Sequence, residues 1–118
     1  MENFHEILGA FASDMQKYSS DDSITRFVYQ NKTHFLISAL IGSKSEGMSF
    51  EQLCNTINTN ICSRSTIQKV LDIGVKCGAF TKKTSEHDKR VRHYQLAAST
   101  TNFFNEWLVR QQTIFKTI

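Results

Sequence analysis

The chain has 118 residues, a length typical of a single domain, and 40% of them are hydrophobic, which argues against a disordered chain. It holds no proline to interrupt long helices, no apolar stretch of about 18 residues that could span a membrane, and three cysteines, which cannot all pair. An acidic start in place of a basic signal segment favours a cytoplasmic protein, and the net charge of +3 by itself says little about partners.

Two apolar segments open the chain. Large apolar side chains recur at spacings of three and four over residues 2–18, which predicts an amphipathic helix. A polar cluster at residues 19–23 ends this pattern and offers N-caps for the next helix. Residues 24–41 are predicted to be helical as well, with a break where Asn31 or Thr33 caps a new helix. The nearly all-apolar residues 35–41 would also suit a buried strand, but the length of the segment favours a helix.

Two short helices separated by a polar turn follow. Ser49 and Gln52 have the spacing of a capping box, which predicts a helix that ends near Ile57. A second helix is predicted to begin at Ser63 or Ser65, and its last turn carries a lysine shortly before the glycine that typically ends a helix. Together the two helices predict a helix-turn-helix.

A β-hairpin is predicted directly after the second of these helices. Residues 80–85 and 90–96 read as short strands with threonine, valine and aromatic side chains, and the polar residues 86–89 join them. Most of the strand residues are basic or polar, so we expect the hairpin to be exposed over most of its length and buried only near Phe80, Tyr94 and Leu96. An exposed basic hairpin behind a helix-turn-helix is a wing.

The positive charge is concentrated in these elements. Residues 60–96 carry eight basic and three acidic side chains, a net charge of +5, which leaves −2 for the rest of the chain. A basic block in an otherwise mildly acidic protein is typical of a nucleic-acid-binding surface. A solvated charged hairpin is the alternative that charge alone leaves open.

The last segment is predicted to be one long amphipathic helix from Ser99, as the N-cap, to Ile118. Its apolar face and that of the first helix together offer more apolar surface than is needed to cover a small winged unit. The two terminal helices therefore either pair across a two-fold axis in a dimer or cover each other within one chain. The candidate dimerisation residues are Phe4, Leu8, Phe11, Phe104, Trp107, Leu108 and Phe115.

Three motifs lie between the second helix of the helix-turn-helix and the end of the hairpin. Residues 65–72, Ser-Thr-Ile-Gln-Lys-Val-Leu-Asp, have the pattern of a recognition helix, and residues 76–80 that of a helix-ending glycine before a wing strand. Residues 86–90 hold an Asp-x-Arg turn ahead of a strand that closes on Leu96. With the two helices before them, these motifs make residues 33–97 resemble the MarR family of winged-helix regulators, including its single-domain SarA-like branch.

The resemblance implies a mainly α-helical fold with a small antiparallel β-hairpin. It implies one domain over residues 1–118, in which a winged helix-turn-helix at 33–97 is flanked by dimerisation helices at 1–20 and 99–118. The chain departs from the family in a longer turn before the recognition helix, in a single helix after the wing, and in Gly74, where the family usually carries leucine. A glycine inside a helix costs about 1 kcal/mol relative to alanine, so we expect Gly74 to weaken or bend this helix.

The recognition helix and the wing hold the candidate DNA contacts. A recognition helix reads base edges from its N-terminal part in the major groove, where arginine binds guanine and glutamine binds adenine. Serine and threonine hydroxyls there hold phosphate or simply cap the helix. The resemblance implies that Asp88 holds Arg90 toward the minor groove, and a solvated ion pair is the alternative. The candidate DNA-binding residues are Ser63, Arg64, Ser65, Thr66, Gln68, Lys69, Lys82, Lys83, Lys89, Arg90 and Arg92.

These observations predict a sequence-specific regulator of transcription that binds double-stranded DNA as a homodimer on an inverted repeat and associates with the nucleoid when bound. The alternative is a winged-helix module for protein–protein interaction without specific DNA binding. No motif predicts an enzyme, and no histidine or cysteine spacing predicts a metal site; no other cofactor is expected. The resemblance also implies an effector pocket between the winged unit and the terminal helices. Phe11, Phe104 and Trp107 are candidates to line it, but core packing is the role that we expect of them.

Overall fold

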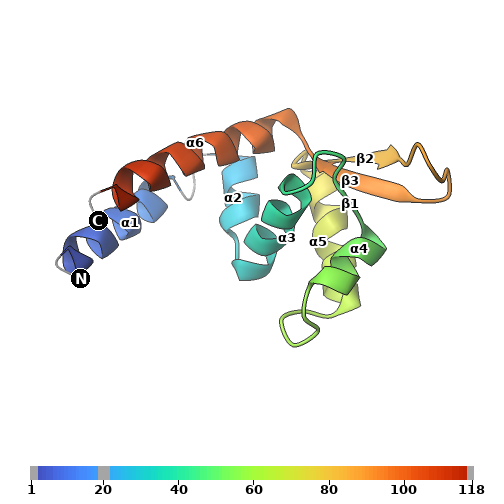
Figure 1. Ribbon diagram of the computed structural model, residues 1–118, viewed down its shortest axis with the longest axis horizontal. Helices are drawn as coiled ribbons and strands as arrows, with labels where there is room; N and C mark the ends of the chain where they lie inside the picture. The colour runs from blue at the N-terminus through green and yellow to red at the C-terminus, as the bar shows by residue number, and fades with distance from the viewer. Residues whose placement is uncertain (1–2, 19–21, 117–118) are drawn as a thin grey trace.

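The structure, a computed structural model, describes residues 3–18 and 22–116. The predicted terminal helices and polar cluster include residues 1–2, 19–21 and 117–118, which lie outside this description. The molecule is elongated, with extents of 52 × 29 × 23 Å (Figure 1). Its described elements are α1 (Phe4–Tyr18), α2 (Ser23–Tyr29), α3 (Lys32–Gly42), β1 (Met48–Ser49), α4 (Phe50–Thr56), α5 (Arg64–Lys76), β2 (Phe80–Thr84), β3 (Arg92–Leu96) and α6 (Ala98–Phe115).

The elongation comes from two regions at opposite ends of the molecule. At one end α1 runs beside the C-terminal half of α6, and we call α1 together with residues 107–115 the terminal arm (Figure 1). The elements from α2 to β3 surround one apolar core, and we call them the winged unit. The radius of gyration is 15.8 Å, against about 13–14 Å for a compact chain of this length. The helical architecture with a small antiparallel sheet confirms the predicted fold class.

Side-chain caps set where the first two helices of the winged unit begin. The Asp22 carboxylate accepts a hydrogen bond of 2.8 Å from the backbone N–H of Thr25 at the start of α2. The Asn31 side chain accepts one of 3.0 Å from the backbone N–H of His34 at the start of α3. The segment predicted to be helical over residues 24–41 is therefore broken at Asn31, as expected.

The helix-turn-helix consists of α4 and α5. The Ser49 hydroxyl accepts the backbone N–H of Gln52 at 3.1 Å, and the Gln52 amide oxygen accepts the N–H of Ser49 at 2.8 Å, which confirms the capping box. Of the two predicted starts for the second helix, Ser63 is the N-cap, because its hydroxyl accepts the N–H of Thr66 at 3.2 Å. Gly78 follows α5 with φ at 87°, in the left-handed region that favours glycine.

The sheet has three antiparallel strands in the order β1-β3-β2, one strand more than the predicted hairpin. The additional strand, β1, has two residues, and Met48 lies opposite Tyr94 of β3. A strand this short has no alternating pattern, so the sequence offers no signal for it. Gly47 precedes β1 with φ at 78°, and a Cβ at this position would collide with the backbone carbonyl of Tyr94.

The core of the winged unit explains the glycine inside α5. This helix runs without interruption through Gly74, and a Cβ there would collide with the ring of Phe80 from β2. Close packing of the ring against the helix therefore requires a glycine, a role that the sequence does not predict. The largest fully buried apolar side chains around it are Val28, Ile37, Ile41, Leu53, Ile67, Leu71 and Phe80.

Ser99 is not the N-cap of α6, contrary to the prediction. The helix begins at Ala98 and is preceded by Ala97, which makes no side-chain cap. Contacts with the turn before β2 accompany this start. The backbone N–H of Ala97 donates to the carbonyl of Ala79 at 3.0 Å, and the buried hydroxyl of Thr100 donates to the same carbonyl at 2.7 Å.

Candidate nucleic-acid interface

The N-terminal part of α5 presents polar side chains to solvent. Ile67, Val70 and Leu71 are buried in the core, at 3% exposure or less, and fix which side of the helix faces outward. The remaining positions of the first two turns are polar and accessible. None of the six residues predicted to contact DNA here is buried: Ser63, Arg64, Ser65, Thr66, Gln68 and Lys69.

The hydroxyl groups at the start of α5 form a small cluster. Ser63 Oγ, which caps the helix, lies 3.0 Å from the Oγ of Ser65 and 3.0 Å from the Oγ1 of Thr66. Capping is therefore the observed role of Ser63. A hydroxyl that accepts one hydrogen bond keeps further bonding capacity, so the cluster can also meet a phosphate at the positive end of the helix.

Acidic side chains hold two of the predicted base-reading residues. The Nη2 of Arg64 lies 2.5 Å from the Oε1 of Glu51, and the Nε2 of Gln68 donates to the Oδ1 of Asp72 at 2.9 Å. Neither acid was predicted to belong to the site. The i, i+4 spacing on one helix could have indicated Asp72, whereas nothing local links Glu51 to an arginine 13 positions later.

The two adjacent lysines of β2 lie on opposite faces of the sheet, because side chains alternate along a strand. Lys82 is opposite Tyr94, and its Nζ lies 5.5 Å from the centre of the tyrosine ring. Lys83 is opposite His93, whose Nδ1 is 3.3 Å from the carbonyl oxygen of Glu46. Both lysines were predicted to contact DNA, and the sheet places them on opposite faces.

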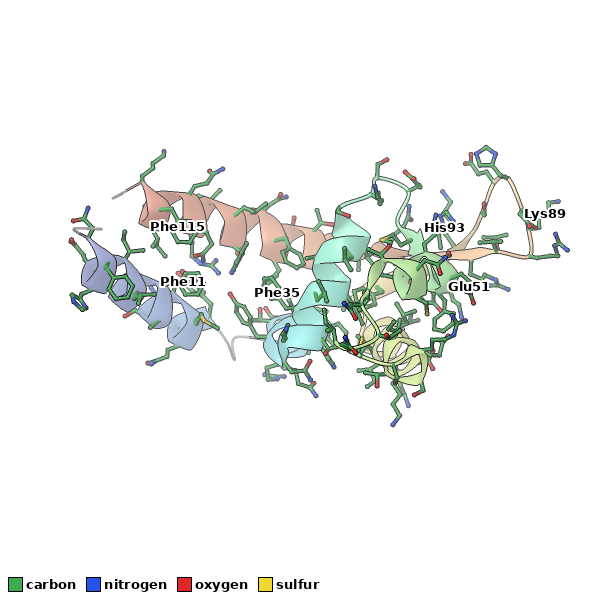
Figure 2. The ribbon with its side chains drawn as sticks, turned by 60° about the horizontal axis from the view of Figure 1, so that its bottom comes forward. Phe11, Phe35, Glu51, Lys89, His93 and Phe115 are labelled. Carbon is green, nitrogen blue, oxygen red and sulfur yellow. The ribbon has the colours of Figure 1, made fainter. Side chains whose placement is uncertain are left out.

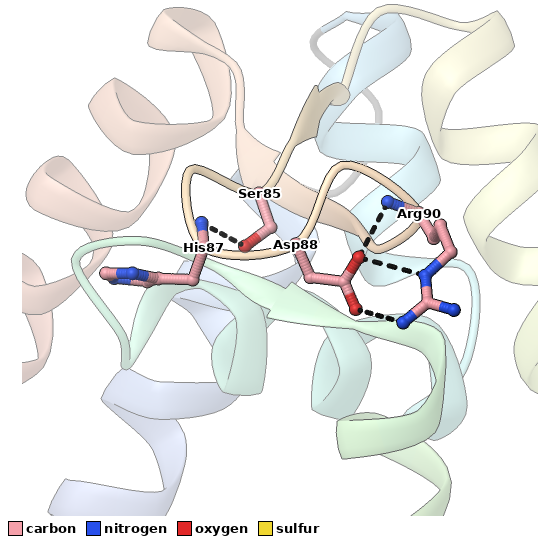
Figure 3. Close-up of polar contacts among 4 residues, drawn as sticks. All are labelled: Ser85, His87, Asp88 and Arg90. Atoms are coloured by element: carbon pink, nitrogen blue, oxygen red, sulfur yellow. Dashed lines mark hydrogen bonds and ion pairs between the residues drawn. The ribbon is translucent and has the colours of Figure 1, made fainter.

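The loop between β2 and β3 carries the Asp-x-Arg motif (Figure 3). Asp88 Oδ1 accepts the backbone N–H of Arg90 at 3.0 Å and its Nε–H at 3.2 Å, and Oδ2 accepts from Nη2 at 3.3 Å. Hydrogen bonds from the Arg90 side chain and backbone lower the pKa of Asp88. The Arg90 side chain is 91% exposed, so the expected Asp88–Arg90 contact is present and presents the guanidinium outward.

The helix-turn-helix and the wing meet at an open cleft of about 380 Å³. Four predicted DNA contacts line it, namely Gln68, Lys82, Arg90 and Arg92, and the carboxylate of Glu51 lines it too. Lys83 does not line it, and Lys89 lies out at the tip of the wing (Figure 2). The cleft therefore joins a polar side chain of α5 to three cations of the wing on one accessible surface.

The terminal arm holds six of the seven candidate dimerisation residues, and the seventh, Phe104, lies just before it on α6. The rings of Phe11 and Phe115 stack within the chain, with centroids 6.1 Å apart (Figure 2). The Nε of Arg110 donates to the carboxylate of Asp14 at 2.7 Å, so α1 packs against α6 of the same chain. This packing is incomplete. Four of the seven candidates remain 46–52% exposed: Phe4, Leu8, Leu108 and Phe115.

Phe104 and Trp107 point toward the winged unit and not away from it. The ring of Phe35 in α3 lies 5.6 Å from that of Phe104 and 5.3 Å from that of Trp107, measured between centroids. Edge-to-face contacts of this kind are favourable in apolar cores. These two residues therefore join α6 to α3 within one chain.

Other chemistry has little support in the described residues. No three histidine, cysteine or acidic side chains in residues 3–18 and 22–116 are grouped to hold a metal ion. No helix in this part of the chain is long and apolar enough to cross a membrane. Cys54, Cys62 and Cys77 are free and half-buried, and burial raises the pKa of the Cys62 thiol, which disfavours the reactive thiolate.

The elements described above, a helix-turn-helix followed by a three-stranded sheet with an extended loop between β2 and β3, define a winged helix. The structure is similar to the crystal structure of the transcriptional regulator SlyA, a MarR-family protein, with a TM-score of 0.59. The match covers 98% of this chain and 75% of the SlyA chain at 14% sequence identity, and it shows a shared MarR-like fold. Comparison with protein-family models and with curated protein sequences finds no match.

Proposed function

We propose that the chain is a sequence-specific regulator of transcription that binds double-stranded DNA as a homodimer on an inverted-repeat operator. The N-terminal part of α5 enters the major groove, and the loop between β2 and β3 reaches the minor groove. The protein forms a single domain over residues 1–118, with α1 and α6 holding two copies together. It acts in the cytoplasm, associates with the nucleoid when bound to DNA, and has no enzymatic activity.

The observation that carries this proposal is the shared surface of α5 and the wing. Gln68 and the cations Lys82, Arg90 and Arg92 line one cleft, and the start of α5 is exposed beside it. Phosphate-binding cations next to side chains that can read base edges are what a specific DNA interface needs. The similarity to a solved transcriptional regulator supports the winged-helix fold on which this proposal depends.

The terminal arm supports the homodimer. Leu8 on α1 and Leu108 on α6 are both half exposed, as are Phe4 and Phe115 near the chain ends. Covering them with a second copy removes apolar surface from water, which is favourable by about 25 cal/mol per Å². A two-fold pairing of this kind places two α5 helices on half-sites about one helical turn apart.

An effector has a candidate place between the terminal arm and the winged unit. A groove of about 730 Å³ is lined mainly by apolar side chains, among them Phe11, Tyr29, Phe35 and Trp107. Phe104, which the resemblance also implied, does not line it. Trp107 is the single tryptophan of the chain, so its fluorescence reports directly on a small apolar molecule bound here.

Selection of bound sequences from a random pool of duplex DNA tests the proposed function. We expect enrichment of an inverted repeat with half-site centres about 10 bp apart. Enrichment of isolated half-sites would exclude the homodimer. No enrichment, together with no measurable affinity for any duplex at low salt, would favour the alternative of a winged-helix module that binds other proteins.

A further inference from the structure

One carboxylate lies within the otherwise cationic cleft. Glu51, the second residue of α4, lines the same cleft as Lys82, Arg90 and Arg92, and Figure 2 shows it on the side of the molecule that carries the wing. A negative charge at this position repels the phosphates that the three cations attract. Its side chain is 65% exposed, and an ion pair this exposed contributes little to folding, so stability does not account for it.

Glu51 is bonded to the arginine that begins the recognition helix. Its Oε1 lies 2.5 Å from the Nη2 of Arg64, and the guanidinium carbon of Arg64 lies 5.0 Å from the centre of the Phe50 ring. The guanidinium is therefore held at one corner by a charged hydrogen bond and on one face by an aromatic ring. Within the described residues no other acceptor binds it, so its remaining N–H groups are available.

The backbone on both sides of this contact is fixed. Phe50 and Glu51 follow Ser49, which caps α4 and pairs with His93 in the sheet. Arg64 follows the N-cap of α5, a helix anchored by its buried apolar side. Two capped helix starts therefore set the backbones that carry Glu51 and Arg64, and the ion pair limits the orientations of the guanidinium, which lowers the entropy lost when it binds a flat acceptor pair.

We propose that Glu51 is a specificity-determining residue that positions Arg64 to read guanine. Its carboxylate holds the guanidinium edge-on for the two acceptors of guanine in the major groove, and its charge opposes nonspecific attachment to the phosphate backbone. The preferred operator carries guanine opposite the start of α5 in each half-site. The inference rests on the proposed DNA-binding function and concerns the same surface.

Binding to two duplexes of equal length, the selected operator and a scrambled sequence, tests this role. We expect Glu51→Gln to bind the scrambled duplex about three- to tenfold more tightly and to lower the ratio of operator to scrambled affinity about tenfold. Glu6→Gln is the matched control, since it removes the same charge from an exposed position of α1. We expect it to leave the ratio unchanged. Thermal melting checks that the variants fold equally well.

Replacement of operator guanines by 7-deazaguanine, which lacks the N7 acceptor, gives a readout that a purely structural role would not move. We expect the parent protein to lose about fivefold or more in affinity at one position per half-site, and Arg64→Ala to lose nothing further there. Glu51→Asp keeps the charge and shortens the reach. We expect it to bind scrambled DNA as weakly as the parent does, with a smaller response to 7-deazaguanine.

An equal change of both affinities in Glu51→Gln and Glu6→Gln would overturn the inference, because bulk charge would then account for the effect. The same holds if no operator position responds to 7-deazaguanine in an Arg64-dependent way. Failure of the parent protein to bind any duplex at low salt overturns the proposed function as well. If the parent protein binds DNA but Glu51→Gln leaves the ratio of operator to scrambled affinity unchanged, only this inference is overturned and the proposed function stands.

Discussion

The winged unit and the terminal arm are built in different ways. In the winged unit, Val28, Ile37 and Leu71 are completely buried, and the polar side chains of the interface stand on that core. In the arm, α1 buries only Ile7 and Asp14 among its described residues. The proposed recognition surface thus belongs to a unit with a well-buried core, to which Phe103 of α6 also contributes, whereas the arm leaves apolar side chains half exposed.

The contact between α1 and α6 in the arm is also more polar than the core of the winged unit. Asp14 lies between Arg110 and Gln111, whose side chains donate to its two carboxylate oxygens at 2.7 and 3.1 Å. A buried polar network of this kind fixes the register of two helices more than it adds to stability. The polar network therefore fixes how α1 and α6 lie against each other. Because the proposed dimer would cover the exposed side of the arm, we expect the stability of the arm to depend on protein concentration.

The same substitution made in the two regions gives the largest expected contrast. Leu71→Ala removes a side chain with no exposed surface, so we expect it to lower the free energy of unfolding by about 2–5 kcal/mol. Leu8→Ala removes one that is 52% exposed, and its effect at low protein concentration should stay below about 1 kcal/mol. Urea unfolding of both variants measures the difference. Equal losses would contradict the division between the two regions.

Gly74→Ala tests the packing of the winged unit. Alanine favours a helix over glycine by about 1 kcal/mol, but its Cβ would collide with the Phe80 ring. We expect the packing cost to prevail and the variant to be destabilised by about 1–3 kcal/mol in thermal or urea unfolding. A stabilised Gly74→Ala protein would show that the ring moves aside without cost.

Leu8→Glu tests the open side of the terminal arm. A charge at this half-exposed position costs little in a monomer but is buried in the proposed dimer. We expect the dimer dissociation constant to rise at least about tenfold in sedimentation experiments. Ser13→Glu, at another exposed position of α1, is the control and should sediment as the parent does. An unchanged dimer dissociation constant in Leu8→Glu would show that the dimer interface does not include this position.

Arg90→Ala tests the wing without disturbing the core. We expect DNA affinity to fall about five- to tenfold on all sequences alike and the salt slope to become shallower by about one unit per lost phosphate contact. Arg26→Ala on α2 is an exposed control of the same chemistry. Gln68→Ala should behave differently from Arg90→Ala, because it should also reduce the discrimination between operator and other sequences. An unchanged affinity of Arg90→Ala would leave the wing without a role in binding.

The smallest expected effect concerns the titration of Asp88. Its pKa is lowered by hydrogen bonds from Arg90, so the contact stabilises the folded loop above the ordinary aspartate pKa. This stabilisation is lost as the pH falls through the lowered folded-state pKa. We expect Arg90→Ala to raise the pKa of Asp88 toward its usual range in an NMR titration. An unshifted titration would show that the ion pair is not formed in solution.

Features that depend on neighbours along the chain were predicted from the sequence. The capping box of Ser49 and Gln52 and the cap at Asn31 both join residues three positions apart. The Asp88–Arg90 contact spans two positions and was carried by the family resemblance. In each case the relevant groups meet in almost any fold that forms the local element.

Features set by tertiary contacts were missed or wrongly placed. The Glu51–Arg64 contact joins two helices, and the start of α6 is accompanied by bonds to Ala79, which lies 21 positions before Thr100. Strand alternation alone could have separated Lys82 from Lys83, because the hairpin itself was predicted. The packing of Gly74 on Phe80 depends on how β2 returns to α5, which no pattern in the sequence expresses.

The salt dependence of binding to the selected duplex tests DNA recognition by the winged unit most directly. With about four phosphates neutralised by each of two protomers, the plot of log affinity against log salt concentration should have a slope near −7. The same slope should be shallower in Arg90→Ala. A flat salt dependence would contradict recognition through the cationic cleft and the wing.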